Sequence, residues 1–184
     1  MNSLDDFARA KLAALRAGAL LRHLPEANRT ALNFCSNDYL GLAHDPRLKA
    51  AAAAALEHGA GAGASRLVTG NHALYAELET KVASLKGEDA ALVFGSGYLA
   101  NLGTIPALVG AGDLILADEL SHACMMSGAK LSGAVVHTYR HNDVDDLRRL
   151  LEAHRPTTGN CLVLTEGVFS MDGDLSPLPD IIAA

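Results

Sequence analysis

The chain has 184 residues, a formal net charge of −6, and a composition that is 49% hydrophobic but only 4% aromatic. This length fits one ordinary domain, and the abundance of alanine favours a helix-rich globular protein. No basic stripe is present to replace phosphate counterions, which argues against nucleic acid as a partner. No apolar run approaches the ~18 residues that cross a bilayer, so no membrane segment is expected.

Residues 1–45 are predicted to form an N-terminal helical and extended segment. Its opening stretch, MNSLDDFARAKLAALRAG, mixes acidic and basic residues, lacks the apolar core of a signal peptide, and predicts an amphipathic helix. The cysteines Cys35, Cys124 and Cys161 lie far apart, without the spacing of a zinc site or a disulfide framework. We therefore expect no metal site and a reducing, cytoplasmic location.

An alanine-rich helix is predicted over 46–58, and the glycine-rich stretch GAGAGASRLVTGN follows at 59–71. A flexible linker is one interpretation of that composition. Because Arg66, Leu67 and Val68 interrupt the glycines, a loop of defined shape is favoured.

Helical and strand patterns alternate from residue 72 onward. A helix is predicted over 72–86 with Asn71 as its N-cap and with its apolar residues on one face: Leu74, Leu78, Val82 and Leu85. The predicted strands are short and apolar: 90–94, 113–117, 134–139 and 161–165. The intervening helices are predicted at 98–109, at 122–131 with Ser121 as cap, and after Asn142 or Asp143 with Val144, Leu147, Leu150 and Leu151. This alternation indicates an α/β fold whose mostly parallel sheet has helices on both faces.

The last residues, PLPDIIAA, have the pattern of a helix that is starting. A doubly wound domain does not normally stop at such a point. We therefore expect residues 46–184 to be the first part of a large domain, within a longer protein that has the rest of that domain and a C-terminal domain.

The turn Gly95-Ser96-Gly97-Tyr98 follows the predicted strand 90–94 and opens the next helix. The first N–H groups of a helix lack intrahelical partners, its dipole is positive there, and small residues let an anion approach. The stretch is neither a Walker loop nor a GxGxxG fingerprint. A plain tight turn and an anion-binding cup explain it equally well.

Polar residues follow two further predicted strands. His122 comes after strand 113–117, where a flat imidazole can stack on a planar ring, although a lone histidine is more often an ordinary surface residue. Glu166 and Ser170 lie close to the end of strand 161–165 and suit polar contacts to a ligand, whereas the turn 171–174 accounts for Asp172 and Asp174. Because ligands of parallel sheets bind at the carboxyl ends of strands, these residues outline a cofactor site.

These stretches resemble the α-oxoamine synthase family of pyridoxal-phosphate (PLP) enzymes of fold type I. The similar stretches run in family order over nearly the whole chain: NFCSNDYLGL (33–42), GAGASRLVTGNHALYAELE (61–79), FGSGYLAN (94–101), DELSHACMM (118–126) and TEGVFSMDGD (165–174). Within the family they are most similar to the member that acts in biotin biosynthesis. The resemblance implies the large domain of a fold-type I PLP-dependent transferase.

The resemblance implies that the residues of the cup hold the PLP phosphate: Ser96, Gly97 and Tyr98, the last through its backbone N–H. It implies that His122 stacks on the pyridine ring as the catalytic residue of this segment. Ser170 is implied to hydrogen-bond near the phenolic oxygen of the ring, with Glu166 beside it. On the substrate side it implies Asn37 and Arg22, the latter for a carboxylate, while an Asx turn in SNDY explains Asn37 equally well.

The implied reaction is the decarboxylative condensation of L-alanine with a pimeloyl thioester of coenzyme A or acyl carrier protein, in a cytoplasmic homodimer whose 59–71 loop can reach the partner's cofactor. Alternatives within the class are 2-amino-3-ketobutyrate ligase, serine palmitoyltransferase and 5-aminolevulinate synthase. A non-catalytic phosphate-binding or assembly domain is the alternative outside it, and the absent GxGxxG disfavours a nicotinamide-binding domain.

The resemblance places the family's Asp-x-Ala-His motif and its cofactor-binding lysine beyond residue 184. The chain has five lysines, and none of them lies in that motif: Lys11, Lys49, Lys81, Lys86 and Lys130. The chain alone is therefore expected to be inactive.

Overall fold

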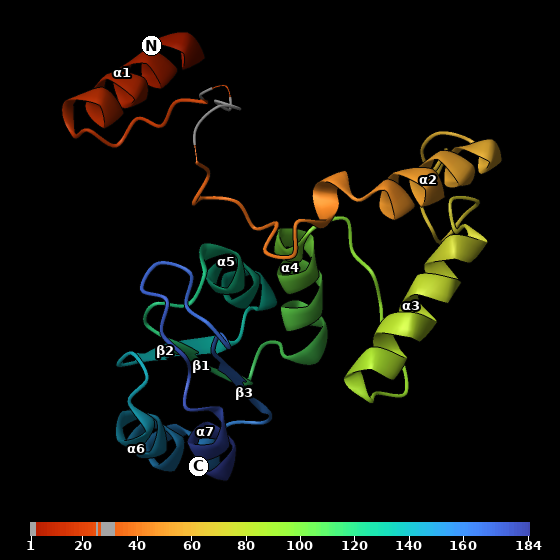
Figure 1. Cartoon of the computed structure of the whole chain (residues 1–184). Coiled ribbons are helices and arrows are strands. Elements are labelled where there is room, and N and C mark those ends of the chain that lie inside the picture. Colours follow the sequence, from red (N-terminus) through yellow and green to blue (C-terminus); the bar gives the residue numbers. More distant parts are fainter. Residues whose placement is uncertain (1–2, 25, 27–31) are drawn as a thin grey trace. The chain divides into compact units, whose positions relative to one another are not determined.

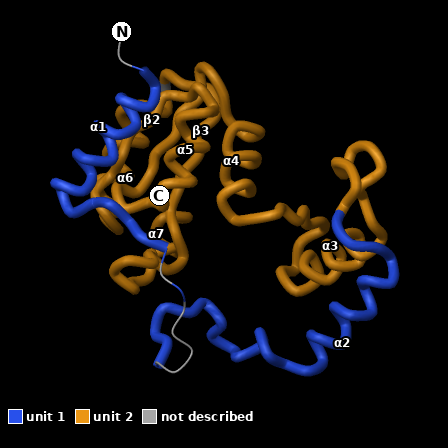
Figure 2. Tube along the Cα trace, turned by 90° about the horizontal axis from the view of Figure 1, so that it is seen from above, with its two compact units in different colours: residues 1–61 blue, residues 62–184 orange. Residues whose placement is uncertain are grey.

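The computed structural model describes residues 3–24, 26 and 32–184 (Figure 1). The chain divides into two compact units, Met1–Gly61 and Ala62–Ala184, which Figure 2 distinguishes by colour. This division falls inside the glycine-rich stretch, later than the predicted boundary after residue 45, which stays a prediction. Among the described residues, none of the helices is both long enough and apolar enough to cross a membrane.

The described residues of the first unit form two helices, α1 (Leu4–Ala17) and α2 (Pro46–Ala55), and two short 3-10 turns, η1 (Leu42–His44) and η2 (Leu56–His58). Helix α1 begins with a capping box, in which the Asp6 amide donates to Ser3 Oγ at 3.1 Å and the Ser3 amide donates to the Asp6 carboxylate at 3.0 Å. Helix α2 begins with Pro46 after an Asp45 cap. Both helices expected in this part of the sequence are confirmed.

The second unit contains a parallel sheet with helices between its strands (Figure 1). Its elements in chain order are α3 (Ala73–Lys86), α4 (Gly97–Leu108), β1 (Leu114–Asp118), α5 (Ala123–Ser132), β2 (Val135–Tyr139), α6 (Val144–His154), η3 (Arg155–Thr157), β3 (Cys161–Leu164) and α7 (Leu178–Ala183). The strand order is β2-β1-β3, and both pairings are parallel, with Leu114 opposite Val135 and Cys161. The predicted α/β alternation is confirmed.

The central strand β1 is buried along its whole length, and its alternating side chains enter two different cores. Ile115 and Ala117 pack in one core with residues of α4 and α5. Leu114 and Leu116 pack in the other core with Tyr139 of β2 and residues of α6. Helices therefore cover both faces of the sheet, as the continuous apolar sequence of this strand predicts.

The strand predicted over 90–94 was wrong, because these residues pair with no other strand of the described chain. Side chains occupy the positions that a neighbouring strand would take. The Val93 amide donates to Glu79 Oε1 at 2.9 Å, and the Val93 carbonyl accepts from Arg66 at 3.3 Å. The segment leading into α4 is thus held at Val93 by the Arg66–Glu79 ion pair instead of a β-ladder.

Two predicted helix caps were wrong, because a histidine takes the position in each case. His72 caps α3 and His122 caps α5, in place of Asn71 and Ser121. Each imidazole accepts the amide two residues further on through Nδ1, at 3.2 Å. The cap of α6 is Asp143, one of the two predicted alternatives.

The glycine-rich stretch has a defined shape where it enters the second unit. Arg66 forms a two-point ion pair with Glu79 of α3, at 2.7 and 3.0 Å, and its guanidinium lies over the Tyr75 ring at 4.5 Å. A Cβ atom at Gly70 would overlap the backbone carbonyl of Ala64, so this position requires glycine. The shaped-loop interpretation is therefore supported over a plain linker.

Candidate functional site

The carboxyl ends of β1 and β3 bring two predicted ligand residues together. The strands are parallel neighbours, with Ala117 opposite Leu164, so the segments that follow them leave the sheet at the same edge. The His122 amide donates to Glu166 Oε1 at 2.5 Å, across 44 positions of sequence. The parallel register thus places a carboxylate beside the start of α5.

The start of α4 has the geometry of an anion-binding cup. Ser96 is the N-cap, and its Oγ accepts the Leu99 amide at 3.2 Å while its carbonyl accepts the Ala100 amide at 3.0 Å. The amides of Gly97 and Tyr98 precede these bonds and, as first-turn donors, have no intrahelical acceptor. Apart from its chain neighbours and the backbone of its own helix, no atom lies within 4 Å of the place where a Gly97 side chain would stand, so a ligand can approach the backbone there.

Close packing of α4 on α5 links the cup to His122. Gly128 lets α5 approach so closely that a Cβ atom there would lie 2.7 Å from the Asn101 carbonyl oxygen. The Asn101 side-chain amide donates to Cys124 Sγ at 3.1 Å, in the first turn of α5. Tyr98 lies one turn before Asn101 and so shares its face of α4. The starts of the two helices are therefore neighbours at this edge of the sheet.

The His122 side chain is exposed, yet its orientation is fixed. Its Nδ1 atom caps α5 by accepting the Cys124 amide and lies 2.9 Å from Cys124 Sγ. The ring can therefore offer a face to a planar ligand without losing contacts that hold it. This geometry suits the stacking role that the resemblance implies for His122.

A second histidine, which the sequence analysis missed, fixes the loop after β3. His141 lies between two carboxylates, with Nδ1 2.9 Å from the buried Asp118 and Nε2 2.8 Å from Asp174. Asn142 donates to the same Asp174 oxygen at 2.8 Å, and the Phe169 ring meets His141 edge-on at 4.4 Å. Asp118 ends β1 and His141 follows the parallel strand β2, so the strand-end rule that selected His122 could have found them.

The electrostatics of this second cluster favour a charged histidine. A neutral imidazole has one N–H donor, whereas both His141 nitrogens face carboxylate oxygens. Hydrogen bonding to Asp118 and then to Asp174 raises the pKa of His141 above its ordinary value. The same contact with His141 lowers the pKa of Asp174. Asp174, which the sequence analysis ascribed to a turn, therefore joins the loop to the ends of β1 and β2.

For three predicted site residues, both the location at the site and the role remain predictions. Ser170 is exposed, directly after the buried Phe169, on the loop that His141 and Asp174 hold. Arg22 and Asn37 belong to the first unit and are exposed. The turn hydrogen bonds near Asn37 are accepted by other side chains, those of Asn33, Ser36 and Asp38.

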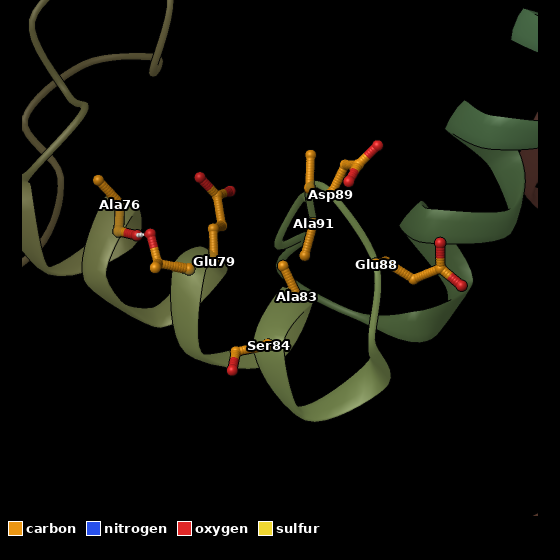
Figure 3. Close-up of a pocket in the computed structure, with 9 residues that line it drawn as sticks. Ala76, Glu79, Ala83, Ser84, Glu88, Asp89 and Ala91 are labelled. Atoms are coloured by element: carbon orange, nitrogen blue, oxygen red, sulfur yellow. Dashed lines mark hydrogen bonds between the residues drawn. The ribbon is translucent and has the colours of Figure 1, made fainter.

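A cleft of about 470 Å³ lies along α3 and contains none of the predicted site residues (Figure 3). Its acidic lining includes Glu79, Glu88 and Asp89. Such a lining repels a phosphate, so we place no PLP there. Over residues 3–24, 26 and 32–184, no group of three potential ligand side chains is arranged to hold a metal ion.

The parallel sheet with helices on both faces, together with the two helix starts at its carboxyl edge, defines the class: the chain has the fold of the first part of a fold-type I PLP-dependent transferase. The solved structures agree. Serine palmitoyltransferase from S. paucimobilis, solved with PLP-myriocin, superposes with a TM-score of 0.84 at 30% identity, over 99% of this chain and 51% of that one. The 8-amino-7-oxononanoate synthase of Francisella tularensis gives a TM-score of 0.69 at 28% identity, over 85% and 43%.

The chain belongs to the aminotransferase class I and II family, whose model matches residues 29–183. It is 59% identical to the 8-amino-7-oxononanoate synthase of Methylobacterium radiotolerans over 99% of this chain and 52% of that protein. It is 60% identical to the synthase of Methylorubrum extorquens strain PA1 over 99% and 51%. The chain thus spans about half the length of the curated relatives that it matches, and the resemblance to the α-oxoamine synthases is confirmed.

Proposed function

We propose that the chain supplies the phosphate-binding and ring-binding part of an 8-amino-7-oxononanoate synthase that uses PLP. The observation that carries this proposal is the hydrogen bond between the His122 amide and Glu166, which joins two of the implied ligand residues across 44 positions of sequence. The free helix-start amides at Gly97 and Tyr98 and the exposed His122 ring fit a phosphorylated pyridine. The 59–60% identity to named synthases supports this member of the family.

Each residue has a definite part in this proposal. The amides of Gly97 and Tyr98 bind the phosphate at the positive end of α4, with the Ser96 hydroxyl beside them. His122 stacks on the ring and limits its tilt. Ser170 donates near the phenolic oxygen, with Glu166 anchoring the start of α5. When bound, PLP supplies an electron-accepting ring that stabilises negative charge at the α-carbon of an amino acid.

The proposed substrates are L-alanine and a pimeloyl thioester of coenzyme A or acyl carrier protein, which yield 8-amino-7-oxononanoate, carbon dioxide and the free thiol. Arg22 is proposed to bind a substrate carboxylate through its guanidinium, and Asn37 to lie at the substrate end of the site. We also propose a cytoplasmic homodimer in which the 59–71 loop approaches the partner's cofactor. The net charge of −6 makes local positive groups, such as the start of α4, necessary for these anions.

The serine palmitoyltransferase activity of the structural neighbours is the second candidate, because those structures superpose well at 30–31% identity. Assays of the full-length protein with alanine, glycine or serine and matched acyl thioesters separate the two activities. The proposal predicts turnover with alanine and pimeloyl thioester at a kcat/KM well above that with serine and palmitoyl thioester. The reverse preference would assign the protein to a sister activity.

The non-catalytic alternative is tested on the purified protein itself. Mass spectrometry gives its length, and absorbance at ~420 nm during PLP titration reveals cofactor bound covalently to a lysine. A mass matching 184 residues together with no such absorbance favours a binding or assembly domain. A larger mass with PLP absorbance supports the synthase.

A further inference from the structure

His122 is held by a small polar network that none of the implied roles includes. Cys124 Sγ lies 2.9 Å from His122 Nδ1, and the Asn101 side-chain amide lies 3.1 Å from the same sulfur. Cys124 is only 4% exposed, whereas His122 is exposed. The buried Cys124 on α5 therefore contacts the inner edge of a ring whose outer part is open to ligands, and the half-buried Asn101 on α4 contacts Cys124.

The donors of this network determine which ring nitrogen has the proton. The Cys124 amide is only a donor and points to Nδ1 at 3.2 Å, which favours a lone pair at Nδ1. The Asn101 amide donates to the sulfur, which leaves the Cys124 S–H free to donate toward Nδ1 as well. A proton on Nδ1 would oppose both donors. The neutral ring is therefore protonated at Nε2, on its outer edge.

The same contacts fix the plane of the ring. Glu166 accepts the His122 amide, and the Cys124 amide and sulfur both meet Nδ1. Asn101 ties the sulfur to α4, which begins with the phosphate cup. Ring orientation and cup position are thus coupled through the side chains of Cys124 and Asn101.

We propose that Asn101 and Cys124 are positioning residues that hold His122 in its Nε2–H tautomer, with the N–H available to an anionic group carried by a ligand on whose planar ring His122 stacks. The identity of that ligand as PLP with its amino-acid substrate rests on the proposed function. The tautomer itself depends only on contacts within this chain.

The test measures the tautomer directly in the protein without added PLP. Long-range proton–nitrogen NMR spectra of histidine-labelled protein at neutral pH distinguish Nδ1–H from Nε2–H rings, and the His122 signals are assigned by their loss in His122→Asn. The wild type is expected to show the Nε2–H form. Cys124→Ala, alone and with Asn101→Leu, removes a donor to Nδ1 and is expected to raise the Nδ1–H fraction roughly 2- to 10-fold.

Conservative rescue separates positioning from simple packing. Cys124→Ser keeps a donor at this place and is expected to restore the Nε2–H form, while Cys35→Ser, at an exposed cysteine, is the matched control. If the double variant does not fold, Cys124→Ala and Cys124→Ser decide the matter. A wild-type Nδ1–H ring, or an unchanged tautomer in Cys124→Ala, would overturn the proposal.

PLP titration of the same variants keeps the two proposals distinguishable. If the His122 tautomer changes in Cys124→Ala but the protein binds no PLP, only the proposed function is refuted. If the protein binds PLP but the His122 tautomer is unchanged in Cys124→Ala, only the positioning role is refuted.

Discussion

The contact between α4 and α5 at Gly128 gives the sharpest prediction for the site. In Gly128→Ala the new Cβ atom would stand 2.7 Å from the Asn101 carbonyl oxygen and 3.0 Å from Ile105 Cδ1. Ordinary contact begins at 3.4 Å, so the helices must separate by the difference from 2.7 Å, about 0.7 Å. The obstructing atom is backbone, which cannot rotate away as a flexible side chain can.

The separation has a moderate energetic cost and a larger functional one. Overpacking costs about 1–3 kcal/mol, and the better helix propensity of alanine returns about 1 kcal/mol. The net loss of about 0–2 kcal/mol lowers Tm by at most ~8 °C for a chain of this size. Because α4 begins with the cup and α5 with His122, the same shift misaligns the two halves of the site. Misplacement by about 1 Å can reduce a rate ~10²-fold, so PLP affinity and turnover should fall more than stability.

Thermal melts and PLP titrations of Gly128→Ala test this reasoning. Gly110→Ala is the matched control, because its Cβ atom would meet its nearest neighbour, the Ser132 carbonyl, at 3.9 Å. If Gly128→Ala melts with Gly110→Ala and binds PLP as the wild type does, the close approach of the helices does not set the site.

Three other predictions concern the elements around the site. Because the pKa of His141 is raised, its contribution to stability is complete below the ordinary pKa of 6.5 and is lost as pH rises through the pKa of the folded state. Because the pKa of Asp174 is lowered, its contribution is present above the ordinary pKa of 3.8 and is lost as pH falls through the pKa of the folded state. Melts of His141→Asn from about pH 5 to about pH 9 should therefore lack the wild-type decline above 6.5, and an unchanged decline would exclude the clamp. Arg66→Lys loses the two-point pairing with Glu79 and should weaken PLP retention, measured by fluorescence, or dimer affinity, measured by sedimentation. Arg66→Ala should weaken the same property further. If both variants keep PLP retention and dimer affinity unchanged, the 59–71 stretch is better explained as a linker. Gly70→Ala should destabilise the protein by about 1–3 kcal/mol in denaturant unfolding, since its Cβ meets backbone, and a neutral result would mean that the loop opens freely.

The hydrophobic pattern predicted the sheet because its central strand, β1, is also its most buried segment. The side chains of residues 114–117 are apolar on both faces of the sheet, and helices cover both faces. The stretch 90–94 has the same pattern but forms no ladder, because an apolar run does not specify its partner. Arg66 and Glu79, 27 and 14 positions away from Val93, satisfy its backbone instead, and no local rule reveals that pairing.

The helix caps show a similar limit of local reasoning. Asparagine and serine are stronger N-caps than histidine in general, which favoured Asn71 and Ser121. In the structure Asn71 Oδ1 accepts from Arg66 Nε at 2.8 Å, so it serves the loop and leaves the cap to His72. Competition for one side chain by a distant partner decides such cases, and the sequence does not display it.

The candidate site divides in the same way between what strand ends specify and what packing specifies. His122 and Glu166 were predictable because parallel neighbouring strands deliver their next residues to one edge. Asn101 and Cys124 were not, because their contact exists only where Gly128 lets two helices meet. The ring of His122 is therefore oriented by three elements at once: its own helix, the loop after β3, and α4. A ligand that contacts both the α4 amides and this ring requires a particular spacing of α4 and α5, so we expect Gly128, which has no side chain, to affect cofactor binding through that spacing.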